Sequence, residues 1–351
     1  MDRVTVDVYE RRIDDYLRRP ARETPAAAAF AARVPDGALR LDLGSGPGRI
    51  TGSLGSPVVA ADAAWSMISR VEATPLRVQA DLEALPFRRS AFGGAWASKC
   101  LQHVPAEQVP MALADLHRTM EVGAPLELVV FETGEGLWVS DRSDDLPGRR
   151  FWDWPRDRLL DVLHGAGFVD LELQTADRGG VVELRVTGAR GRTLADVVGP
   201  GMRLLLCGLN PSVYAADAGL GFARPGNRFW PAALAAGIVS RDRDTWHALR
   251  HHGVGFTDLV KRASVAAAEL TADELRDGLA RVERLCGWLR PDVVCFLGLT
   301  GWRTAVDRSA PLGWQDRTLG GSRVYVMHNP SGLNAHARVE TLAEHLRTAA
   351  T

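Results

Sequence analysis

Glycines and an aspartate near residue 45 form the first group of residues that could bind a ligand. The strand-like segment ALRLDLG contains Asp42 and runs directly into the loop Gly44-Ser45-Gly46-Pro47-Gly48. Glycines let a backbone turn sharply and approach a ligand, and a helix that follows would direct its positive end at that ligand. The pattern D-x-G-x-G-x-G therefore predicts a nucleotide-binding loop, and it also fits a dinucleotide site. Its members are Asp42, Gly44, Gly46 and Gly48.

Two further aspartates narrow the kind of nucleotide. The apolar run VVAAD ends in Asp62, which is placed to accept hydrogen bonds from two ribose hydroxyls, and QADLEALPF puts Asp81 at the end of a third strand, within reach of an adenine amino group. Together these segments resemble the class I S-adenosylmethionine-dependent methyltransferases over roughly residues 35–187. The resemblance implies S-adenosylmethionine as the cofactor. A Rossmann fold that binds another nucleotide, or none, is the alternative.

The methyl acceptor is not revealed by this half of the chain. It contains no N-P-P-[YFW] segment like that of amino-methylating DNA enzymes and no Pro-Cys dipeptide like that of cytosine-C5 enzymes. His103 could act as a base near the transferred methyl group, or it could serve in packing or capping. The segment AAWSMIS after Asp62 looks short, so the domain is either compact or has lost its activity.

Polar loops also follow two strand-like runs in the second half. One run is RLLLCGLNPS, Arg203–Ser212, followed by GLGFARPGNRFWPAAL, and the other is RVYVMHNPSGLNAH, Arg323–His336. Proteins of the α/β class bind ligands at the carboxyl ends of their strands. The two loops are far apart in the sequence, so we expect the fold to bring them together.

The motifs GLNP, PGNRFW and NPSGLN, in this order, resemble those of the mismatch-specific uracil/thymine DNA glycosylases of the uracil-DNA glycosylase superfamily. The match runs over residues 193–351 and includes GVGFTDLVKRASVAAAEL. It implies hydrolysis of the N-glycosidic bond of uracil or thymine mispaired with guanine in double-stranded DNA, without a cofactor for this half. Such a reaction needs a water held at C1′ and hydrogen-bond donors for the departing base anion.

The resemblance also implies roles for single residues. Asn210 would position the water, and Asn329 would donate a hydrogen bond toward the base carbonyl. Phe222 would stack on the base in a pocket that also involves Gly208 and Ser212. Asn227 would hold the pocket loop or read the base edge. Taken alone, Asn210 before a proline fits a turn residue equally well.

Base flipping would bring C1′ within reach of these groups, at a cost of a few kcal/mol that is lower for a mismatched base. Leu333 would be the apolar wedge that fills the vacated stack. The backbone from Gly332 to Ala335, which includes Asn334, would contact the orphaned guanine. Arg262 is a candidate for a phosphate contact, although surface arginines are usually solvated. Further candidates of this kind are Arg224, Arg228 and Lys261.

Two positions depart from the family pattern. Ser212 stands where a glycine usually follows GxNP, so a side chain there could crowd the pyrimidine. Leu220, between Gly219 and Gly221, stands where a polar residue or a histidine is expected. The preference among uracil, thymine and damaged bases such as ethenocytosine therefore stays open.

Composition excludes several classes of protein. The 351 residues contain no apolar run of about 18 residues that would suggest a membrane helix and no apolar signal segment at the start, so we expect a cytoplasmic protein. The four cysteines show no metal-ligand spacing, and Cys207 and Cys295 lie in apolar runs that predict core positions. From residue 200 on, 18 arginines and lysines face 14 acidic residues, a surplus that is compatible with phosphate contacts but does not demand them.

Alternation of apolar strand-like runs with helix-like stretches predicts an α/β protein with two three-layer α/β/α domains. The glycine-rich stretch GARGRT marks the boundary, so we expect a Rossmann-like methyltransferase fold over 1–190 and a uracil-DNA glycosylase fold with a short parallel sheet over 191–351. Strand candidates in the second half are MRLLLCG, VGFTDLV, DVVCFLG and RVYVMHN. A closing antiparallel hairpin is expected in the first half.

The sequence thus predicts a monomeric DNA repair enzyme of base excision repair that is fused to a methyltransferase of unknown acceptor. Two alternatives remain. The methyltransferase could act on a small molecule or RNA beside a degenerate glycosylase module, or the second half could be a mismatch sensor that scarcely cleaves. Asn210 and Leu333 favour catalysis, because a decayed module would be expected to have lost one of them.

Overall fold

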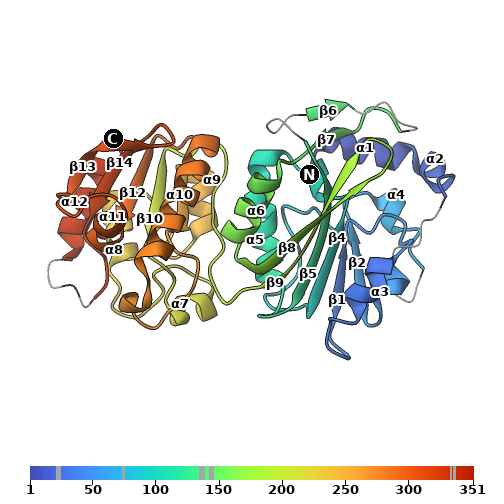
Figure 1. Cartoon of the computed structure of the whole chain (residues 1–351), viewed down its shortest axis with the longest axis horizontal. Coiled ribbons are helices and arrows are strands. Elements are labelled where there is room, and N and C mark those ends of the chain that lie inside the picture. Colours follow the sequence, from blue (N-terminus) through green and yellow to red (C-terminus); the bar gives the residue numbers. More distant parts are fainter. Residues whose placement is uncertain (21–24, 73–75, 134–138, 142–145, 333, 335–336) are drawn as a thin grey trace. The chain divides into compact units, whose positions relative to one another are not determined.

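The computed structural model describes residues 1–20, 25–72, 76–133, 139–141, 146–332, 334 and 337–351. Contacts within the chain divide it into two compact units, which Figure 1 draws in blue to green and in yellow-green to red. The N-terminal unit comprises Met1–His164 and Phe168–Gly191, and the C-terminal unit comprises Arg192–Thr351 with Gly165–Gly167. Within the described residues, no helix is both long and apolar enough to cross a lipid bilayer.

A seven-stranded sheet with the order β3-β2-β1-β4-β5-β9-β8 forms the centre of the N-terminal unit. The first five strands in this order run parallel, and β9 is antiparallel to both of its neighbours, which is the closing hairpin expected from the sequence. β1 and β2 are buried along their whole length, as strands covered on both faces must be. The strands are β1 (Arg40–Leu43), β2 (Val58–Asp62), β3 (Leu76–Gln79), β4 (Gly94–Ser98), β5 (Pro125–Phe131), β8 (Phe168–Asp177) and β9 (Val182–Arg190).

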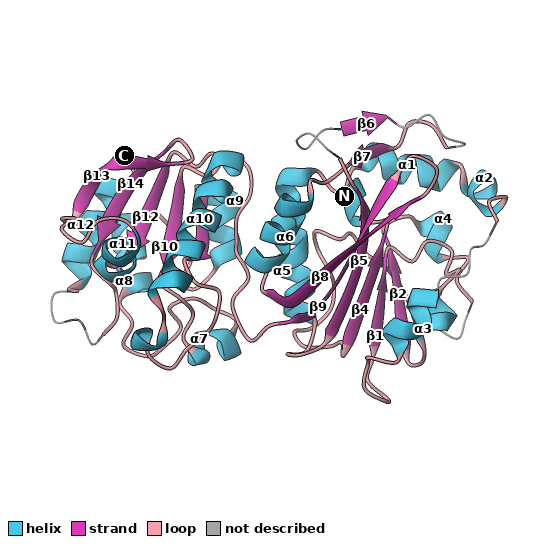
Figure 2. Ribbon diagram, viewed as in Figure 1, coloured by secondary structure: helices cyan, strands magenta, loops and turns pink. Residues whose placement is uncertain are grey.

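Helices and short connecting elements cover this sheet (Figure 2). The N-terminal helix α1 begins where the Asp2 carboxylate accepts a hydrogen bond from the Thr5 backbone N–H at 2.8 Å, an ordinary N-cap. The helices are α1 (Arg3–Arg11), α2 (Ile13–Leu17), α3 (Pro25–Ala31), α4 (Trp65–Ile68), α5 (Val109–Thr119) and α6 (Arg156–Gly165). The short strands β6 (Val139–Asp141) and β7 (Arg150–Trp152) pair antiparallel.

A five-stranded sheet with the order β11-β10-β12-β14-β13 forms the centre of the C-terminal unit. Four strands are parallel and match the four predicted ones: β10 (Leu204–Gly208), β11 (Val254–Asp258), β12 (Val293–Leu297) and β14 (Ser322–Met327). The fifth, β13 (Gly313–Leu319), was not predicted and runs antiparallel at the edge. The sheet is therefore mixed rather than purely parallel.

Six helices are described in the C-terminal unit. The longest, α10, begins with a capping box in which Thr271 and Glu274 satisfy each other's backbone N–H groups. Helices α10 and α11 cover one face of the sheet, and α8 packs against α12 on the opposite face. The helices are α7 (Val213–Ala218), α8 (Phe229–Ala236), α9 (Thr245–His252), α10 (Ala272–Leu289), α11 (Leu299–Ala305) and α12 (Val339–Ala349).

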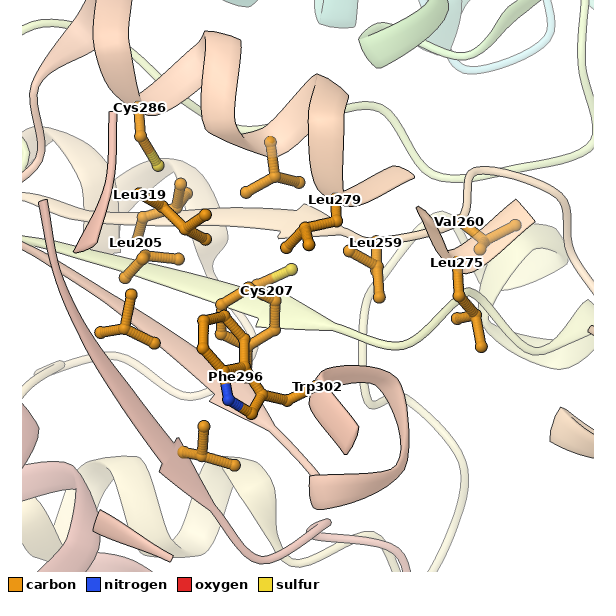
Figure 3. Close-up of a cluster of buried hydrophobic side chains, with 14 of the residues drawn as sticks. Leu205, Cys207, Leu259, Val260, Leu275, Leu279, Cys286, Phe296, Trp302 and Leu319 are labelled. Carbon is orange, nitrogen blue, oxygen red and sulfur yellow. The ribbon is translucent and has the colours of Figure 1, made fainter. Parts of the chain in front are cut away.

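The core between this sheet and α10 and α11 fixes which strand residues face which layer (Figure 3). Leu205 and Cys207 of β10 point into it beside Phe296 of β12, Leu279 of α10 and Trp302 of α11. Because side chains alternate along a strand, Leu204, Leu206 and Gly208 face the opposite layer. Cys207 and Cys295 are fully buried and unpaired, which confirms their predicted core positions.

Candidate functional sites

Asp42 lies at the base of the glycine loop in the N-terminal unit. Its carboxylate is buried in β1 and accepts a 2.6 Å hydrogen bond from the Thr51 hydroxyl. Burial raises the pKa of Asp42 to about 7, although the Thr51 hydrogen bond opposes the shift. The side chain thus ties the loop to the segment that follows it.

Asp62 ends β2 and faces the same loop. Its carboxylate accepts hydrogen bonds of 2.9 Å from the backbone N–H groups of Gly46 and Ala64. Burial raises the pKa of Asp62 to about 6, since these two hydrogen bonds only partly offset the loss of solvent. The residue therefore orders the glycine loop and the loop after β2 at once.

The glycines at positions 44, 46 and 48 all have positive φ angles, of 68°, 55° and 80°. Gly44 is also constrained by space, because a Cβ atom there would overlap the side chain of Cys100, which follows β4. Only glycine meets both conditions without strain. The segment after β4 consequently lies directly against the glycine loop.

Replacing Gly44 by alanine should lower the free energy of unfolding of the N-terminal unit by about 1–3 kcal/mol, since the new methyl group overlaps Cys100. Urea unfolding of the full chain measures the effect. Gly52→Ala is the matched control, because a Cβ atom at Gly52 meets nothing within 4 Å. Equal stability of the two variants would contradict the assigned constraint.

Asp81 is placed differently from the sequence expectation. β3 ends at Gln79, and the Asp81 carboxylate forms a salt bridge with the amino group of Met1 at 2.8 Å. Among the described residues, Met1 and Leu82 line the cavity beside the glycine loop, whereas Asp81 does not. Its predicted contact with an adenine amino group stays a prediction.

A cavity of about 1020 Å³ opens beside the glycine loop, entirely within the N-terminal unit. Asp42, Gly44, Gly46 and Asp62 line one end of it. The remaining wall carries aromatic and charged side chains, among them Tyr9, Lys99, His103, Phe131, Arg149, Phe151 and Glu183. Pockets that bind one drug-sized ligand usually measure about 300–1,000 Å³, so this cavity lies at the upper end of that range.

Asn210 follows β10 in the C-terminal unit, and its amide is held in one orientation. The Nδ2 group donates to the Arg262 carbonyl at 2.9 Å and to the Ser264 hydroxyl at 2.8 Å. The Ser264 hydroxyl in turn donates to the Ala266 carbonyl at 2.9 Å, which leaves its lone pair for Asn210. The Oδ1 atom of Asn210 has no partner in the described part of the chain.

Phe222 has an unusual backbone and a half-exposed ring. Its φ angle is 60°, a left-handed value that is a genuine outlier for a bulky residue. The ring packs against that of Phe229 in α8, with centroids 4.2 Å apart and the ring planes tilted by 32°, and the Trp230 indole N–H donates to the preceding Gly221 carbonyl at 3.0 Å. The local strain is thus maintained by packing from α8.

Asn227, Ser212 and Gly208 each have a local structural role. Asn227 accepts a 2.9 Å hydrogen bond from the Phe229 N–H and so orders the start of α8. Ser212 is the N-cap of α7, where its hydroxyl accepts from the Ala215 N–H at 3.2 Å. Gly208 ends β10, and a Cβ atom there would overlap the carboxylate of Asp258.

The two loops expected to meet do meet. Arg228 donates from its backbone to Pro330 at 3.0 Å and from its guanidinium to the Asn334 and Ala337 carbonyls at 2.9 and 3.0 Å. A Cβ atom at Gly332 would lie 2.5 Å from the Gly226 carbonyl oxygen, so glycine permits this close approach. The PGNRFW and NPSGLN segments therefore form one surface.

Asn329 lies exposed after β14 on this surface. Its Oδ1 atom accepts the Ser331 N–H at 2.8 Å, and its carbonyl accepts from the Asn334 side chain at 3.1 Å. The Nδ2 group has no partner among the residues that the structure describes, so it is a donor available to a ligand. Leu333, the predicted wedge, lies outside the described residues.

Three of the residues predicted to contact phosphates lie in different environments. The Lys261 side chain is buried and pairs with Asp196 at 2.7 Å, so it is not a surface group and that expectation is wrong. Arg228 is occupied in holding the loop around Asn334. Arg262 is exposed, and its guanidinium pairs with Glu274 at 2.6 Å.

Asp258 is a residue that the sequence interpretation missed. It is the last residue of β11 and lies beside Gly208 of β10 in the sheet. Its side chain is on the same face as that of Phe256, two residues earlier, whose ring lies 5.9 Å from that of Trp230 in α8. Asp258 therefore faces the layer of α8. Its carboxylate accepts no hydrogen bond from any residue that the structure describes. Burial raises its pKa to about 6, although Lys261 opposes the shift. An aspartate at the end of a buried strand was the signal that identified Asp62, and it applies equally here.

Comparisons with known proteins match the two parts of the chain to different families. Residues 195–349 match the family model of the uracil DNA glycosylase superfamily, and residues 41–126 match that of a methyltransferase domain. The Burkholderia thailandensis 1,6-didemethyltoxoflavin-N1-methyltransferase is a similar solved structure, with 23% identity and a TM-score of 0.44 over 53% of this chain and 85% of that one. The Synechocystis magnesium protoporphyrin IX methyltransferase is similar over 53% and 94% of the two chains, with 15% identity and a TM-score of 0.41.

Proposed function

We propose that this chain, which joins a methyltransferase domain to a domain of the uracil-DNA glycosylase superfamily, excises uracil mispaired with guanine from double-stranded DNA. Residues 191–351 would form the glycosylase and residues 1–190 an S-adenosylmethionine-dependent methyltransferase. Thymine and damaged pyrimidines are further candidate bases. The enzyme would act in DNA base excision repair as a monomer.

The orientation of Asn210 carries the glycosylase proposal. Because Nδ2 donates to Arg262 and Ser264, the amide oxygen Oδ1 is left as an acceptor for a ligand or a water. An acceptor of this kind can hold a water by one of its protons, with the water oxygen directed at C1′. An amide is a weak base, which suits a late attack on a departing base and implies a slow enzyme.

Stabilisation of the leaving base would come from the surface around Asn329. Its Nδ2 group is the available donor for a base carbonyl on which negative charge develops. The half-exposed ring of Phe222, fixed on Phe229, provides a stacking platform for a flipped pyrimidine. Leu333 would fill the vacated stack, and the backbone from Gly332 to Ala335 would contact the orphaned guanine.

Asp258 adds a second group to this mechanism. Its carboxylate lies against Gly208, two residues before Asn210, and a pKa of about 6 keeps it mostly ionised at neutral pH. An ionised carboxylate can take up a proton from the attacking water or stabilise positive charge on the sugar. We therefore assign Asp258 as the general base or electrostatic partner of Asn210.

Strand cleavage after alkali treatment tests the proposed activity. Labelled duplexes with a single G·U, G·T or G·C pair are incubated with the full chain, and abasic sites are converted to breaks. We expect cleavage of the G·U duplex at the uracil and none of the G·C duplex. A protein that binds the G·U duplex but leaves every base in place would be a mismatch sensor instead.

The glycine loop and the cavity support S-adenosylmethionine as the cofactor of residues 1–190. Gly44, Gly46 and Gly48 of the glycine loop have positive φ angles, in which a residue with a side chain would be strained. The loop lines one end of the cavity. Asp62, at the same end, has a carboxylate suited to ribose hydroxyls. When bound, this cofactor supplies an electrophilic methyl group, and the chain's own residues would hold and orient it.

Replacing Asp62 by alanine should weaken the binding of S-adenosylhomocysteine by about 10- to 100-fold, because charge-assisted hydrogen bonds to the ligand and to the glycine loop are lost together. Isothermal titration calorimetry measures the affinity. Asp36→Ala, at an exposed aspartate of the same unit, is the control and should bind like the wild type. Unchanged affinity in the Asp62 variant would contradict the cofactor assignment.

A further inference from the structure

The cavity of the N-terminal unit extends past the glycine loop to a wall of side chains that the cofactor alone does not explain. We propose that this wall is the methyl-acceptor site, in which Tyr9 and His103 form a proton relay for a planar acceptor that carries an O–H or N–H group. Tyr9, His103 and Phe151 all line the cavity. This inference rests on the methyltransferase activity proposed above.

Hydrogen bonds define the protonation pattern of the relay. The Nδ1 atom of His103 lies 2.8 Å from the Arg150 carbonyl oxygen, which can only accept, so Nδ1 carries the proton. The Nε2 atom is then a lone-pair acceptor, and the Tyr9 hydroxyl lies 3.0 Å from it. Tyr9 therefore donates to His103, with the direction of the proton path set by the Arg150 backbone.

Arg149 completes the arrangement on the tyrosine side. Its guanidinium donates to the Tyr9 oxygen at 2.9 Å and lies over the rings of Tyr9 and Phe151 at 5.4 and 5.0 Å. A cation at this position stabilises negative charge on the tyrosine oxygen as a proton passes through it. Burial nevertheless raises the pKa of Tyr9 to about 12, so at rest the hydroxyl is neutral.

Contacts connect Tyr9 and His103 to the segments that form the glycine-loop end of the cavity. The Ser66 hydroxyl, just after the loop that begins at Asp62, donates to the Tyr9 carbonyl at 3.0 Å. His103 lies three residues after Cys100, whose side chain packs against Gly44 of the glycine loop. Tyr9 is thus bound to the segment after β2, and His103 follows closely on a residue that packs against the glycine loop.

The surrounding side chains favour a flat, partly apolar acceptor. The rings of Phe131 and Phe151 lie 6.1 Å apart, and the His103 ring lies 4.7 Å from that of Phe151. The Lys99 ammonium sits 5.7 Å from the centre of the Phe131 ring and pairs with Glu183. Aromatic rings offer their faces to planar ligands, and the nearby cations favour one that becomes anionic on losing its proton.

The transfer is balanced by the groups present. A new bond forms between the acceptor oxygen or nitrogen and the methyl carbon, and the electrons of the broken carbon–sulfur bond stay on sulfur. The acceptor proton moves to the Tyr9 oxygen while the Tyr9 proton moves to Nε2 of His103. The positive charge that was on sulfur is then on the imidazolium, whose Nδ1–H remains bound to the Arg150 carbonyl.

Methylation of two phenols by the full chain tests the relay. Catechol keeps its proton in mildly alkaline buffer, whereas 4-nitrophenol has already lost it. We expect Tyr9→Phe and His103→Gln to slow methylation of catechol by about 100-fold or more while changing that of 4-nitrophenol by less than about threefold. Tyr325→Phe is the matched control, because it breaks a comparable 2.7 Å hydrogen bond to His345 in the other unit.

Calorimetry with S-adenosylhomocysteine and nitrogen-15 spectra of His103 accompany the assay. Unchanged affinity in both variants and a protonated Nδ1 in the wild type are the expected results. A wild type that binds S-adenosylhomocysteine but methylates neither phenol would overturn the acceptor assignment. Equal losses on both phenols, or none on catechol, would overturn the relay. Failure of the wild type to bind S-adenosylhomocysteine would instead refute the methyltransferase function itself.

Discussion

Asn210→Ala should reduce the rate of uracil release from a G·U duplex by about 1,000-fold while leaving duplex binding within about threefold of the wild type. The amide is the group that presents an acceptor to water, and alanine removes it without filling the space. Single-turnover kinetics on a labelled duplex separate this chemical step from binding and product release. A loss confined to affinity would contradict the role of Asn210.

Ser264→Ala should cause a smaller loss of rate than Asn210→Ala. It removes one of the three acceptors of Nδ2 but leaves Asn210 itself, so we expect a loss of about tenfold, as for one hydrogen bond. Ser309→Ala, in an exposed turn of the same unit, is the matched control and should be neutral. A Ser264 variant as fast as the control would show that the amide needs no such support.

Asp258→Asn should slow uracil release by about 100-fold and at the same time stabilise the C-terminal unit. Ionisation of Asp258 is opposed by burial, with its pKa raised to about 6. The wild-type rate should therefore rise as pH increases through about 6, and the variant should lose this dependence. Rates measured across this pH range provide the test.

The stability effect has a definite sign. An aspartate whose pKa is raised on folding destabilises the protein progressively as pH rises from the unfolded-state value to the folded-state value. Above about pH 6 the whole penalty is present, so asparagine should increase the free energy of unfolding by about 1–3 kcal/mol there and by little at acid pH. Asp316→Asn, on the exposed edge strand, is the control for both measurements. A fully active Asp258 variant would exclude Asp258 from the chemistry.

The strand-end loops were predictable because local sequence signals are strongest at the ends of apolar strands. Asp42 and Asp62 each sit in or at the end of an apolar run, and the motif around Asn210 follows another, so alternation of strands and helices was enough to place them. The meeting of the PGNRFW and NPSGLN segments was also expected. Its cause, the close approach of Gly332 to Gly226, depends on tertiary packing and is visible only in the structure.

The edge strand β13 was missed although the sequence carries a signal for it. Leu319-Gly320-Gly321-Ser322 places two glycines between β-compatible segments, which is typical of a tight hairpin turn, and Gly320 and Gly321 both have positive φ angles. The strand itself is largely exposed and polar, with the sequence GWQDRTL. Its hydrophobic periodicity is therefore too weak to identify it.

Charge sign alone misplaced Lys261. Lys261 looked like a surface group, but it pairs with the buried Asp196, which also accepts hydrogen bonds from Arg281 and Thr257. Tyr9 was overlooked because its helix lies far in sequence from His103 and from the glycine loop. The spacing of Tyr9, Ile13 and Tyr16, which pack in one cluster, was the available sign of an apolar helical face.

Release of free uracil from a G·U duplex, quantified by mass spectrometry for the wild type and Asn210→Ala side by side, tests the glycosylase assignment most directly. We predict that the wild type releases one uracil per duplex and leaves the matched G·C duplex intact, and that the variant binds the G·U duplex but releases about 1,000-fold less in the same time. Release at equal rates by both proteins, or by neither, would contradict the assignment of Asn210 as the residue that positions the water.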